Sequence, residues 1–240
     1  MGQNHEMPRG FFVTGTDTDV GKTWVSLGLV EQLKRQGKSV GVMKPVAAGC
    51  HPSAEGLRNE DAELLQQQAS LKLDYHALNP YALEPAIAPH IAADEAGLRI
   101  DIETLYQHYL AIAGKSDCVV VEGAGGWLVP LNDFQTMADL AQRLALPVIL
   151  VVGMRLGCIN HALLSAEIIR ARGLALAGWV ANRITPEMPR LEENIATLEQ
   201  RLDAPLLGRI PHLDSLDAAT IADHLTLPPE ANSQRPDWLL

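Results

Sequence analysis

The sequence predicts a single α/β domain of three layers, a mostly parallel central sheet with helices on both faces. A glycine-containing loop stands between an apolar run and a helix near the start of the chain. Further apolar runs alternate with helical stretches as far as residue 225, and they are continuous rather than alternating, which is typical of buried parallel strands. The composition, 47% hydrophobic and 20% charged, is globular, and 240 residues fit one large domain.

The loop within Val13–Thr23 (VTGTDTDVGKT) is predicted to bind nucleotide phosphates. Small and polar residues follow an apolar run, and Gly-Lys-Thr opens a helix. This is the layout of a P-loop, in which backbone N–H groups and lysine bind phosphate and the threonine hydroxyl contacts Mg²⁺. Five residues rather than four separate the two glycines, so we expect the loop to bulge or to use Thr16 in place of the first glycine. The fold class is therefore P-loop NTPase-like.

Charge and hydropathy exclude several classes of partner. The net charge of −10 argues against a nucleic-acid-binding surface and against a basic membrane-docking face. The longest apolar stretch, Leu144–Met154, is too short to cross a bilayer, and residues 1–9 lack an apolar signal core and are expected to form a flexible tail. The three cysteines lack metal-ligand spacing. We therefore expect a cytoplasmic protein.

The segment after the P-loop is predicted to place a lysine at the edge of the sheet. A helix is expected over Thr23–Gln36, because apolar residues recur four apart and Gly37 suits the position after a helix. A strand over Ser39–Met43 then brings Lys44 to its carboxyl end, where α/β sheets place ligands. Position alone nevertheless favours an ordinary surface lysine.

A loop over 47–57 is expected to lead into a helix with Asp61 in its first turn. An acidic residue there usually complements the helix dipole, so the residues alone favour that role over metal binding. An irregular connection over 79–89 and a helix over Ile102–Ala113 follow.

The apolar strand Cys118–Glu122 ends in a carboxylate and is followed by four small residues, 123–126. A terminal acid downstream of a P-loop is typical of a Walker-B element, which holds Mg²⁺ directly or through water. The acid is usually Asp, whereas this chain has Glu122. The alternative is a strand that simply ends in a solvated glutamate.

Three further strand–helix units complete the sheet. They are predicted over Val148–Val152 with His161–Arg172, Leu176–Ala181 with Leu191–Leu202, and Leu206–Ile210 with Ala218–Leu225. Asn160 is a good N-cap, and the free N–H groups of that helix start could bind a carboxylate, although capping alone explains the residue equally well. His212 follows a strand and is by default exposed.

Taken together, these motifs resemble the dethiobiotin synthetase family. The resemblance is carried by the order and spacing of motifs over almost the whole chain: VTGTDTDVGKT (13–23), KPVAAG (44–49), LRNEDA (57–62), VEGAGGW (121–127), LGCINHA (156–162), GWVAN (178–182) and PLLGRIP (205–211). It implies an ATP-dependent cyclo-ligase that forms a homodimer. It also implies that 7,8-diaminononanoate captures CO₂ as a carbamate, which attacks the γ-phosphate of ATP. The resulting carbamic–phosphoric mixed anhydride then closes to dethiobiotin, with ADP and phosphate as the other products.

The resemblance also assigns residues. Lys44 and Lys22 would be catalytic, and Thr23, Asp61 and Glu122 would hold Mg²⁺. The substrate would meet Thr18, Asp19, Lys44 and Ala48, with its carboxylate bound across the dimer interface at Cys158 and Asn160. The ATP site would be formed by residues of the P-loop, the Walker-B region and two later loops: Asp19, Val20, Gly21, Lys22, Thr23, Trp24, Asp61, Glu122, Gly123, Ala124, Gly125, Asn182, Arg183, Pro211, His212 and Leu213.

Two residues depart from the family pattern. The family commonly has a small hydroxyl residue at the place of Ala48, and often an Asp at the place of Arg183. These departures concern affinity more than reaction type. The preference among ATP, CTP and GTP stays open.

Other P-loop proteins are alternatives to this interpretation. A ParA- or MinD-like dimerisation switch ATPase would carry a second lysine early in the loop, where this chain has Thr16, Asp17 and Thr18. A cobyrinic-acid amidase-type synthetase would require an added glutaminase domain. A GTPase would need an Asn-Lys-x-Asp motif, which Asn182-Arg183-Ile184-Thr185 does not match.

Overall fold

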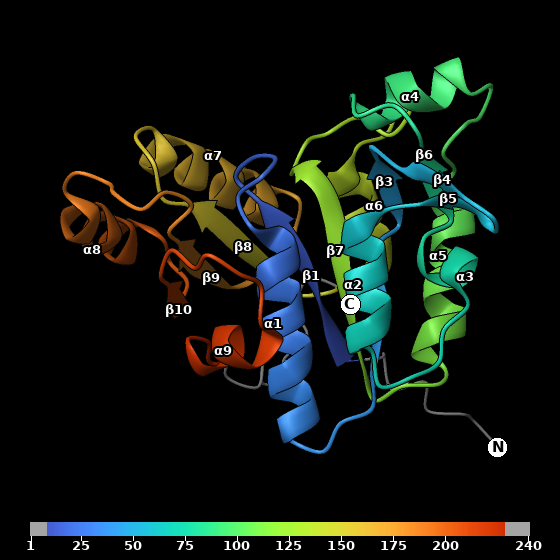
Figure 1. Cartoon of the computed structure of the whole chain (residues 1–240). Helices are drawn as coiled ribbons and strands as arrows, with labels where there is room; N and C mark the ends of the chain where they lie inside the picture. Colours follow the sequence, from blue (N-terminus) through green and yellow to red (C-terminus); the bar gives the residue numbers. More distant parts are fainter. Residues whose placement is uncertain (1–8, 229–240) are drawn as a thin grey trace, which may run out of the picture.

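A six-stranded sheet forms the middle layer of the structure, a computed structural model that describes residues 9–228 (Figure 1). All neighbouring strands of this sheet pair in parallel. Their order across the sheet is β10 (Leu206–Ile210), β9 (Leu176–Asn182), β8 (Val148–Gly153), β1 (Arg9–Gly15), β7 (Cys118–Gly126) and β2 (Val40–Met43). Of the expected tail, Arg9 is the first residue of β1 and residues 1–8 lie outside the described residues.

Helices cover both faces of the sheet, as the continuous apolar strands predict. Alternate side chains of each strand supply the two cores: Val13 and Val120 pack on one face, Phe12 and Val121 on the other, and all four are fully buried. The first face is covered by α1 (Lys22–Arg35), α2 (Glu60–Gln68), α3 (Tyr75–Leu78) and α9 (Ala218–Asp223). The second is covered by α5 (Ile102–Ala113), α6 (Met137–Leu144), α7 (Cys158–Ala171) and α8 (Leu191–Arg201).

Two segments expected to be irregular contain regular structure. The loop expected at 47–57 includes β3 (Val46–Ala48), β4 (His51–Ser53) and β5 (Gly56–Arg58), and the connection at 79–89 includes β6 (Tyr81–Leu83) and the start of α4 (Pro89–Glu95). The strand β3 pairs in parallel with β6, which is distant in sequence, so no local pattern indicates it. Pro89 is the first residue of α4, a position where proline needs no N–H partner.

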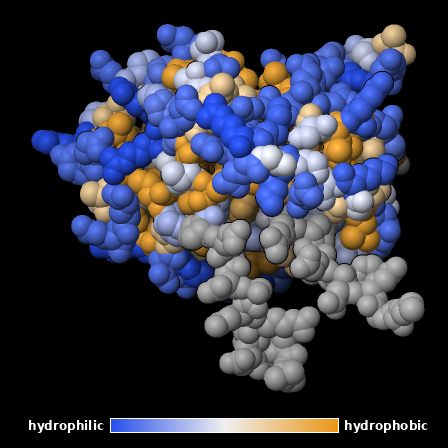
Figure 2. Space-filling view, turned by 90° about the horizontal axis from the view of Figure 1, so that it is seen from below, coloured by the Kyte–Doolittle hydropathy of each residue, from blue (hydrophilic) through white to orange (hydrophobic). Residues whose placement is uncertain are grey.

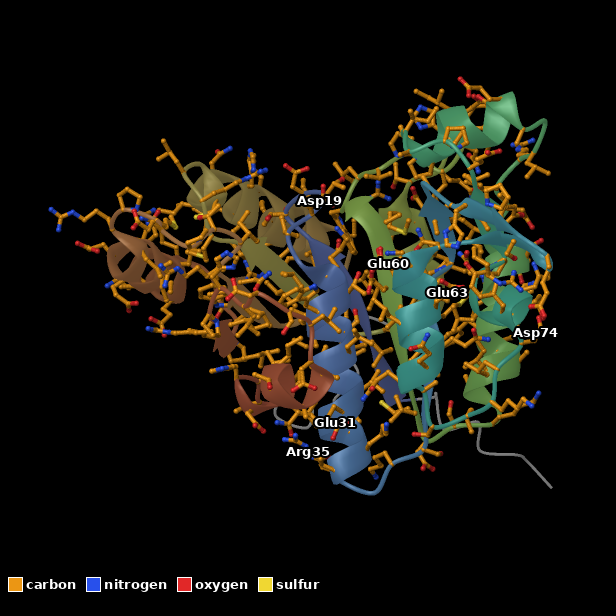
Figure 3. All side chains as sticks on the ribbon, in the orientation of Figure 1. Asp19, Glu31, Arg35, Glu60, Glu63 and Asp74 are labelled. Atoms are coloured by element: carbon orange, nitrogen blue, oxygen red, sulfur yellow. The ribbon has the colours of Figure 1, made fainter. Side chains whose placement is uncertain are left out.

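The arrowheads of β1, β7 and β8, which mark their carboxyl ends, lie in the upper part of Figure 1, and α4 stands at the top of the molecule. In Figure 3, Asp19 lies near the N-terminal end of α1, whereas Glu31 and Arg35 lie at the C-terminal end of that helix. The face seen from below is mostly hydrophilic with scattered apolar residues (Figure 2). Among residues 9–228, no helix is both long and apolar enough to cross a membrane.

Candidate active site

The P-loop connects the end of β1 to the start of α1. Gly15 is the last residue of β1, and the N–H of Thr16 donates to the carbonyl of Val151 at 2.9 Å. The loop proper therefore begins at Thr16, where the first glycine of an ordinary motif would stand. Asp19 adopts the left-handed conformation (φ 57°), which acidic residues tolerate better than most.

Gly21 is required by both conformation and space. Its φ is +88°, and a Cβ at this position would lie 2.0 Å from Nδ2 of Asn182. The amide of Asn182, at the end of β9, donates to the carbonyl of Val20 at 2.8 Å and so fixes the loop from the side. The close approach of the end of β9 to the P-loop is thus possible only with glycine at position 21.

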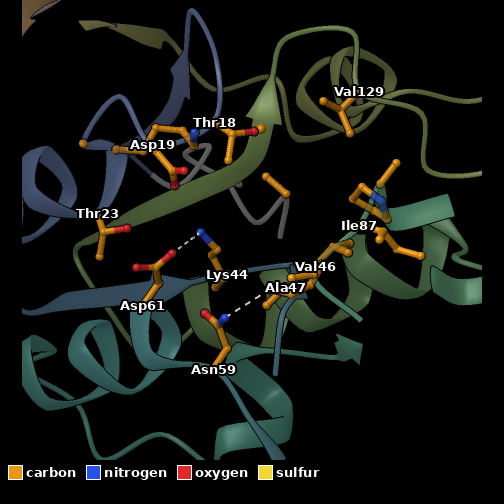
Figure 4. A pocket seen from close by; sticks show the side chains of 18 of the residues that line it. Thr18, Asp19, Thr23, Lys44, Val46, Ala47, Asn59, Asp61, Ile87 and Val129 are labelled. Atoms are coloured by element: carbon orange, nitrogen blue, oxygen red, sulfur yellow. Dashed lines mark hydrogen bonds and ion pairs between the residues drawn. The ribbon is translucent and has the colours of Figure 1, made fainter. Parts of the chain in front are cut away.

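A cluster of charged side chains, in which Lys44 and Glu122 are buried and Asp61 is partly exposed, lies beneath the loop. The ammonium of Lys44 lies 2.5 Å from Oε1 of Glu122 and 3.2 Å from Oδ2 of Asp61. The hydroxyl of Thr23 donates to the same Oε1 at 2.9 Å. Figure 4 shows the Lys44 side chain directed toward Asp61, with Thr23 beside it. The strand expected to end at Glu122 in fact continues to Gly126, so Glu122 lies in the middle of β7. Lys44 follows the end of β2 and Asp61 lies in the first turn of α2, and all three side chains meet at the first turn of α1.

This cluster corrects the interpretations based on position alone. Lys44 is 5% exposed and Glu122 is 0% exposed, so neither is a solvated surface charge. Burial opposes the charge on Lys44, but the carboxylates of Glu122 and Asp61 outweigh it and raise the pKa of Lys44. Burial likewise opposes ionisation of Asp61, yet Lys44 and the Thr23 hydroxyl lower its pKa. Asp61 thus does more than complement the dipole of α2.

Lys22 occupies a different position from Lys44. Its ammonium donates to the carbonyl of Asp17 at 2.8 Å, within the P-loop. Burial, with repulsion from Lys44, lowers the pKa of Lys22 to about 8. Lys22 is therefore a buried cation that an anionic ligand would stabilise.

A cavity of about 880 Å³ opens above this cluster. In Figure 4, Ile87 and Val129 lie across the cavity from Thr23 and Asp61. The predicted residues that line it come from the P-loop and the start of α1, the end of β2, β3, α2 and the end of β7: Thr18, Asp19, Gly21, Lys22, Thr23, Trp24, Lys44, Ala48, Asp61, Ala124 and Gly125. Val20, Glu122 and Gly123 are buried and line neither this cavity nor the smaller one described below.

A second, smaller cavity of about 210 Å³ adjoins the first. Asp19, Gly21 and Trp24 line both. The remaining predicted residues of the ATP site line the smaller one: Asn182, Arg183, Pro211, His212 and Leu213. The residues expected to bind the phosphates and those expected to contact the base therefore line adjoining cavities.

The oxygen atoms beneath the large cavity suit a hard divalent cation. Oε2 of Glu122 is buried and has no hydrogen-bond partner, although a buried carboxylate oxygen normally has one. With Asp61 and the Thr23 hydroxyl it forms a set of oxygen donors of the type that Mg²⁺ prefers. Within residues 9–228 no three His, Cys, Asp or Glu side chains are grouped to hold a metal ion. This set would thus need phosphate oxygens or water to complete a coordination shell.

The start of α7 lies apart from both cavities. The helix begins at Cys158, and Gly157 (φ 96°) is its N-cap, so the prediction that Asn160 is the N-cap is wrong. Asn160 lies within the first turn and is exposed, whereas Cys158 is buried and its Sγ lies 4.0 Å from Oδ1 of Asn194. In this single chain neither residue lines a described cavity.

Several cavity residues were missed by sequence reasoning. Asn59 lines the cavity and caps α2 by accepting from the N–H of Ala62 at 3.3 Å. Its place before an acidic first turn is a capping signal that could have identified it. The others come from the segments whose regular structure was not predicted, and from the loop after β7: Val46, Ala47, Ala86, Ile87, Ala88, Pro89, Val129 and Pro130.

Comparison with known proteins gives sequence relatives over almost the full length. Residues 9–220 match a protein-family model described as an AAA domain. The chain is 56% identical over 220 residues to the ATP-dependent dethiobiotin synthetase BioD of Pseudomonas aeruginosa, covering 91% of this chain and 96% of the relative. It is 53% identical over 221 residues to the protein of the same name from Nitrosospira multiformis, covering 92% and 96%.

Solved structures that resemble this one are P-loop proteins of other kinds. The MinD cell division protein of Aquifex aeolicus has a TM-score of 0.53 at 19% identity, covering 90% of this chain and 88% of that one. The signal recognition particle receptor FtsY of Elizabethkingia anophelis has a TM-score of 0.51 at 13% identity, covering 95% and 62%. At these identities the likeness concerns the fold alone.

Proposed function

This chain belongs to the ATP-dependent dethiobiotin synthetase family, and on that premise we propose how its two cavities carry out the reaction. The chain is an ATP-dependent ligase that forms dethiobiotin. The likeness to MinD reflects a shared fold, so a switch ATPase is the weaker alternative. The observation that carries the proposal for the site is the buried Lys44–Glu122–Asp61–Thr23 cluster beneath a cavity that also adjoins the P-loop.

The P-loop would bind the phosphates of ATP, and the smaller cavity would bind its base. Gly21 and the start of α1 present backbone N–H groups, and Lys22 is a buried cation beside them. Asn182, Arg183 and residues 211–213 surround the space for the base. The preference among nucleotides depends on these loop contacts.

Thr23, Asp61 and Glu122 would hold Mg²⁺. The unpartnered Oε2 of Glu122 and the hydroxyl of Thr23 support this assignment. When bound, the ion supplies positive charge that stabilises the phosphate oxygens during transfer.

The substrate would occupy the rest of the large cavity. Val46, Ile87 and Val129 offer apolar surface for the alkyl chain of 7,8-diaminononanoate, and Thr18 and Asp19 offer polar groups for its amines. Ala48 has no hydroxyl, so the substrate loses one hydrogen bond that the family commonly provides.

We propose that Lys44 binds the anion formed when one amine adds to CO₂ and loses a proton. The carbamate oxygen then attacks the γ-phosphate, the bond from that phosphorus to the ADP oxygen breaks, and Lys22 offsets the charge on the transferring group. The second amine attacks the carbonyl carbon of the mixed anhydride and expels phosphate, which closes the ring. Both lysines line the large cavity, where this negative charge would accumulate.

We further propose that the protein acts as a homodimer in the cytoplasm. Cys158 and Asn160 lie apart from the cavities of their own chain, which supports a role toward the substrate carboxylate of a partner subunit. The three cysteines are free thiols, which suits a reducing compartment.

An assay of ADP release with and without the diamine tests the proposed function. The protein with bicarbonate, Mg²⁺ and ATP should release ADP only when 7,8-diaminononanoate is present, with dethiobiotin as product. Lys44→Ala should lower turnover by at least about a hundredfold while nucleotide binding persists. Lys72→Ala, at an exposed lysine between α2 and α3, is the matched control and should be unchanged. ADP release independent of the diamine would favour a switch ATPase instead.

A further inference from the structure

Lys44 binds one oxygen of each of the two carboxylates proposed to hold the metal. Oε1 of Glu122 accepts from both Lys44, at 2.5 Å, and Thr23, at 2.9 Å. Oδ2 of Asp61 accepts from Lys44 at 3.2 Å. A cation held by the Thr23 hydroxyl and both carboxylates would therefore lie beside the Lys44 ammonium, which is bound to the same two carboxylates.

The cluster contains two carboxylates, those of Asp61 and Glu122, and one ammonium that contacts both, that of Lys44. Lys22 adds a second positive charge near them. Buried charges are stable only when paired, and Lys44 is the cation that pairs these carboxylates. A divalent ion bound to the same carboxylates would repel the Lys44 ammonium, because both are positively charged.

The backbone of Lys44 is fixed, so only its side chain is free to respond. The N–H of Lys44 donates to the carbonyl of Leu78 at 3.0 Å, and its carbonyl accepts from Nδ2 of Asn79 at 2.7 Å. The side chain, by contrast, borders the cavity beside Val46 and Ala47, where the substrate would bind. A displaced ammonium would therefore enter the substrate half of the cavity.

We infer that Lys44 and a divalent cation compete for Glu122 and Asp61, so that metal–nucleotide binding releases the Lys44 ammonium into the cavity to meet the carbamate. In the free protein Lys44 is thus the counter-ion of the two carboxylates, and it becomes a catalytic group once metal and nucleotide are bound. The site therefore favours binding of metal and nucleotide before productive binding of the substrate. This inference rests on the proposed metal role of Thr23, Asp61 and Glu122.

A cation bound only at Oε2 of Glu122 is the competing arrangement, because that oxygen has no partner. Lys44 would then keep its contacts with Oε1 and with Asp61. The two arrangements differ in whether the environment of the Lys44 ammonium changes when metal binds, and that difference can be measured.

The first experiment measures Mn²⁺ binding by electron paramagnetic resonance without nucleotide or diamine. Lys44→Met frees the two carboxylates and should lower the Kd for Mn²⁺ by at least about tenfold, a typical coupling between linked ligands. Lys72→Met removes the same charge from an exposed position and should leave the Kd unchanged. An affinity in Lys44→Met equal to or weaker than that of the wild type would overturn the inference.

The second experiment uses the wild-type protein and so does not depend on the folding of a variant. Lysine labelled with ¹³C at Cε gives one NMR signal per side chain, and the Lys44 signal is the one lost in Lys44→Arg. Adding Mg²⁺ to the protein with ADP should shift this signal, whereas ADP with a chelator should not. A Lys44 signal that stays in place when Mg²⁺ binds would place the ion at Oε2 alone and refute the displacement.

Neither measurement requires dethiobiotin formation. A protein that makes dethiobiotin but shows no competition would retain the proposed function and lose the inference. A protein that shows competition but makes no dethiobiotin would retain the inference and lose the proposed function.

Discussion

Replacing Glu122 by glutamine removes one charge from the buried cluster and changes the shape of the side chain little. Glu122 is fully buried, and its Oε1 accepts from Lys44 at 2.5 Å and from Thr23 at 2.9 Å. The amide oxygen can still accept both bonds, but Lys44 then keeps only one carboxylate, Asp61 at 3.2 Å. The amide NH₂ group can lie in two places. It either faces the Lys44 ammonium, or it takes the position of Oε2, where no hydrogen-bond partner is present.

The expected cost follows from these contacts. Breaking a buried ion pair by removing one partner costs about 3–5 kcal/mol, and the amide oxygen recovers part of this. We therefore expect Glu122→Gln to lower the free energy of unfolding by about 3 kcal/mol, which corresponds to a Tm roughly 6–12 °C lower for a chain of this size. Lys44→Met leaves two carboxylates unpaired and should cost a similar amount, about 3 kcal/mol.

Urea unfolding monitored by circular dichroism measures these differences, and a double-mutant cycle assigns them. The variant with both Glu122→Gln and Lys44→Met has neither charge of the pair. Its loss of free energy of unfolding should therefore be at least about 2 kcal/mol smaller than the sum of the two single losses. A loss below about 0.5 kcal/mol for Glu122→Gln, or additive single effects, would refute the claim that this pair is energetically coupled.

The pH dependence of the same stability has a defined sign. The pKa of Lys44 is raised in the folded protein, so its contribution is present below the ordinary lysine value of 10.5 and is lost as the pH rises through the folded value. The pKa of Asp61 is lowered, so its contribution is present above 3.8 and is lost as the pH falls through the folded value. Between these limits the stabilisation by the cluster should not change with pH, and a titrating loss near neutrality would contradict it.

Three further predictions concern the P-loop. The pKa of Lys22 is about 8, so the free protein loses this charge as the pH rises, and affinity for ADP should fall by up to about tenfold per unit above pH 8, as calorimetry can measure; a constant affinity would contradict the lowered pKa. Gly21→Ala places a Cβ 2.0 Å from Nδ2 of Asn182 at φ +88°, so ADP affinity measured by fluorescence should fall at least about tenfold, and unchanged binding would show that the loop can shift. Thr23→Val removes the donor to Glu122 and should raise the Mg²⁺ concentration needed for nucleotide binding about tenfold or more, whereas an unchanged requirement would deny Thr23 a metal role.

The central sheet could be predicted because its signals are local. Val148–Val152 is a continuous apolar run, and burial on both faces makes such a run sufficient to identify a strand. The helix Ile102–Ala113 was predicted with its observed bounds from apolar residues that recur along one face, and in the structure Asp101 caps its start. The strand pair β3–β6 was missed, because its register joins Val46 to Tyr81 across the fold.

Conformation at single residues explains the error at α7. Asn160 has good capping chemistry, but the left-handed Gly157 begins the helix earlier and leaves Asn160 inside the first turn. The sequence contains both residues, and the choice between them depends on how β8 delivers the chain to the helix.

The sequence alone determined which chemical groups this protein offers: a phosphate-binding loop, two lysines and two carboxylates at the ends of predicted elements. Because parallel strands place their carboxyl ends at one edge, it also indicated that these groups share a site. Only the tertiary structure decided their pairing. Sequence position alone predicts that Lys44 is a surface residue. In the structure it is a buried counter-ion, because β2 and β7 are neighbours and the first turn of α2 brings Asp61 to them. The distance between charges that are far apart in sequence is set by packing, and packing here brings Lys44 onto the two carboxylates proposed to bind Mg²⁺.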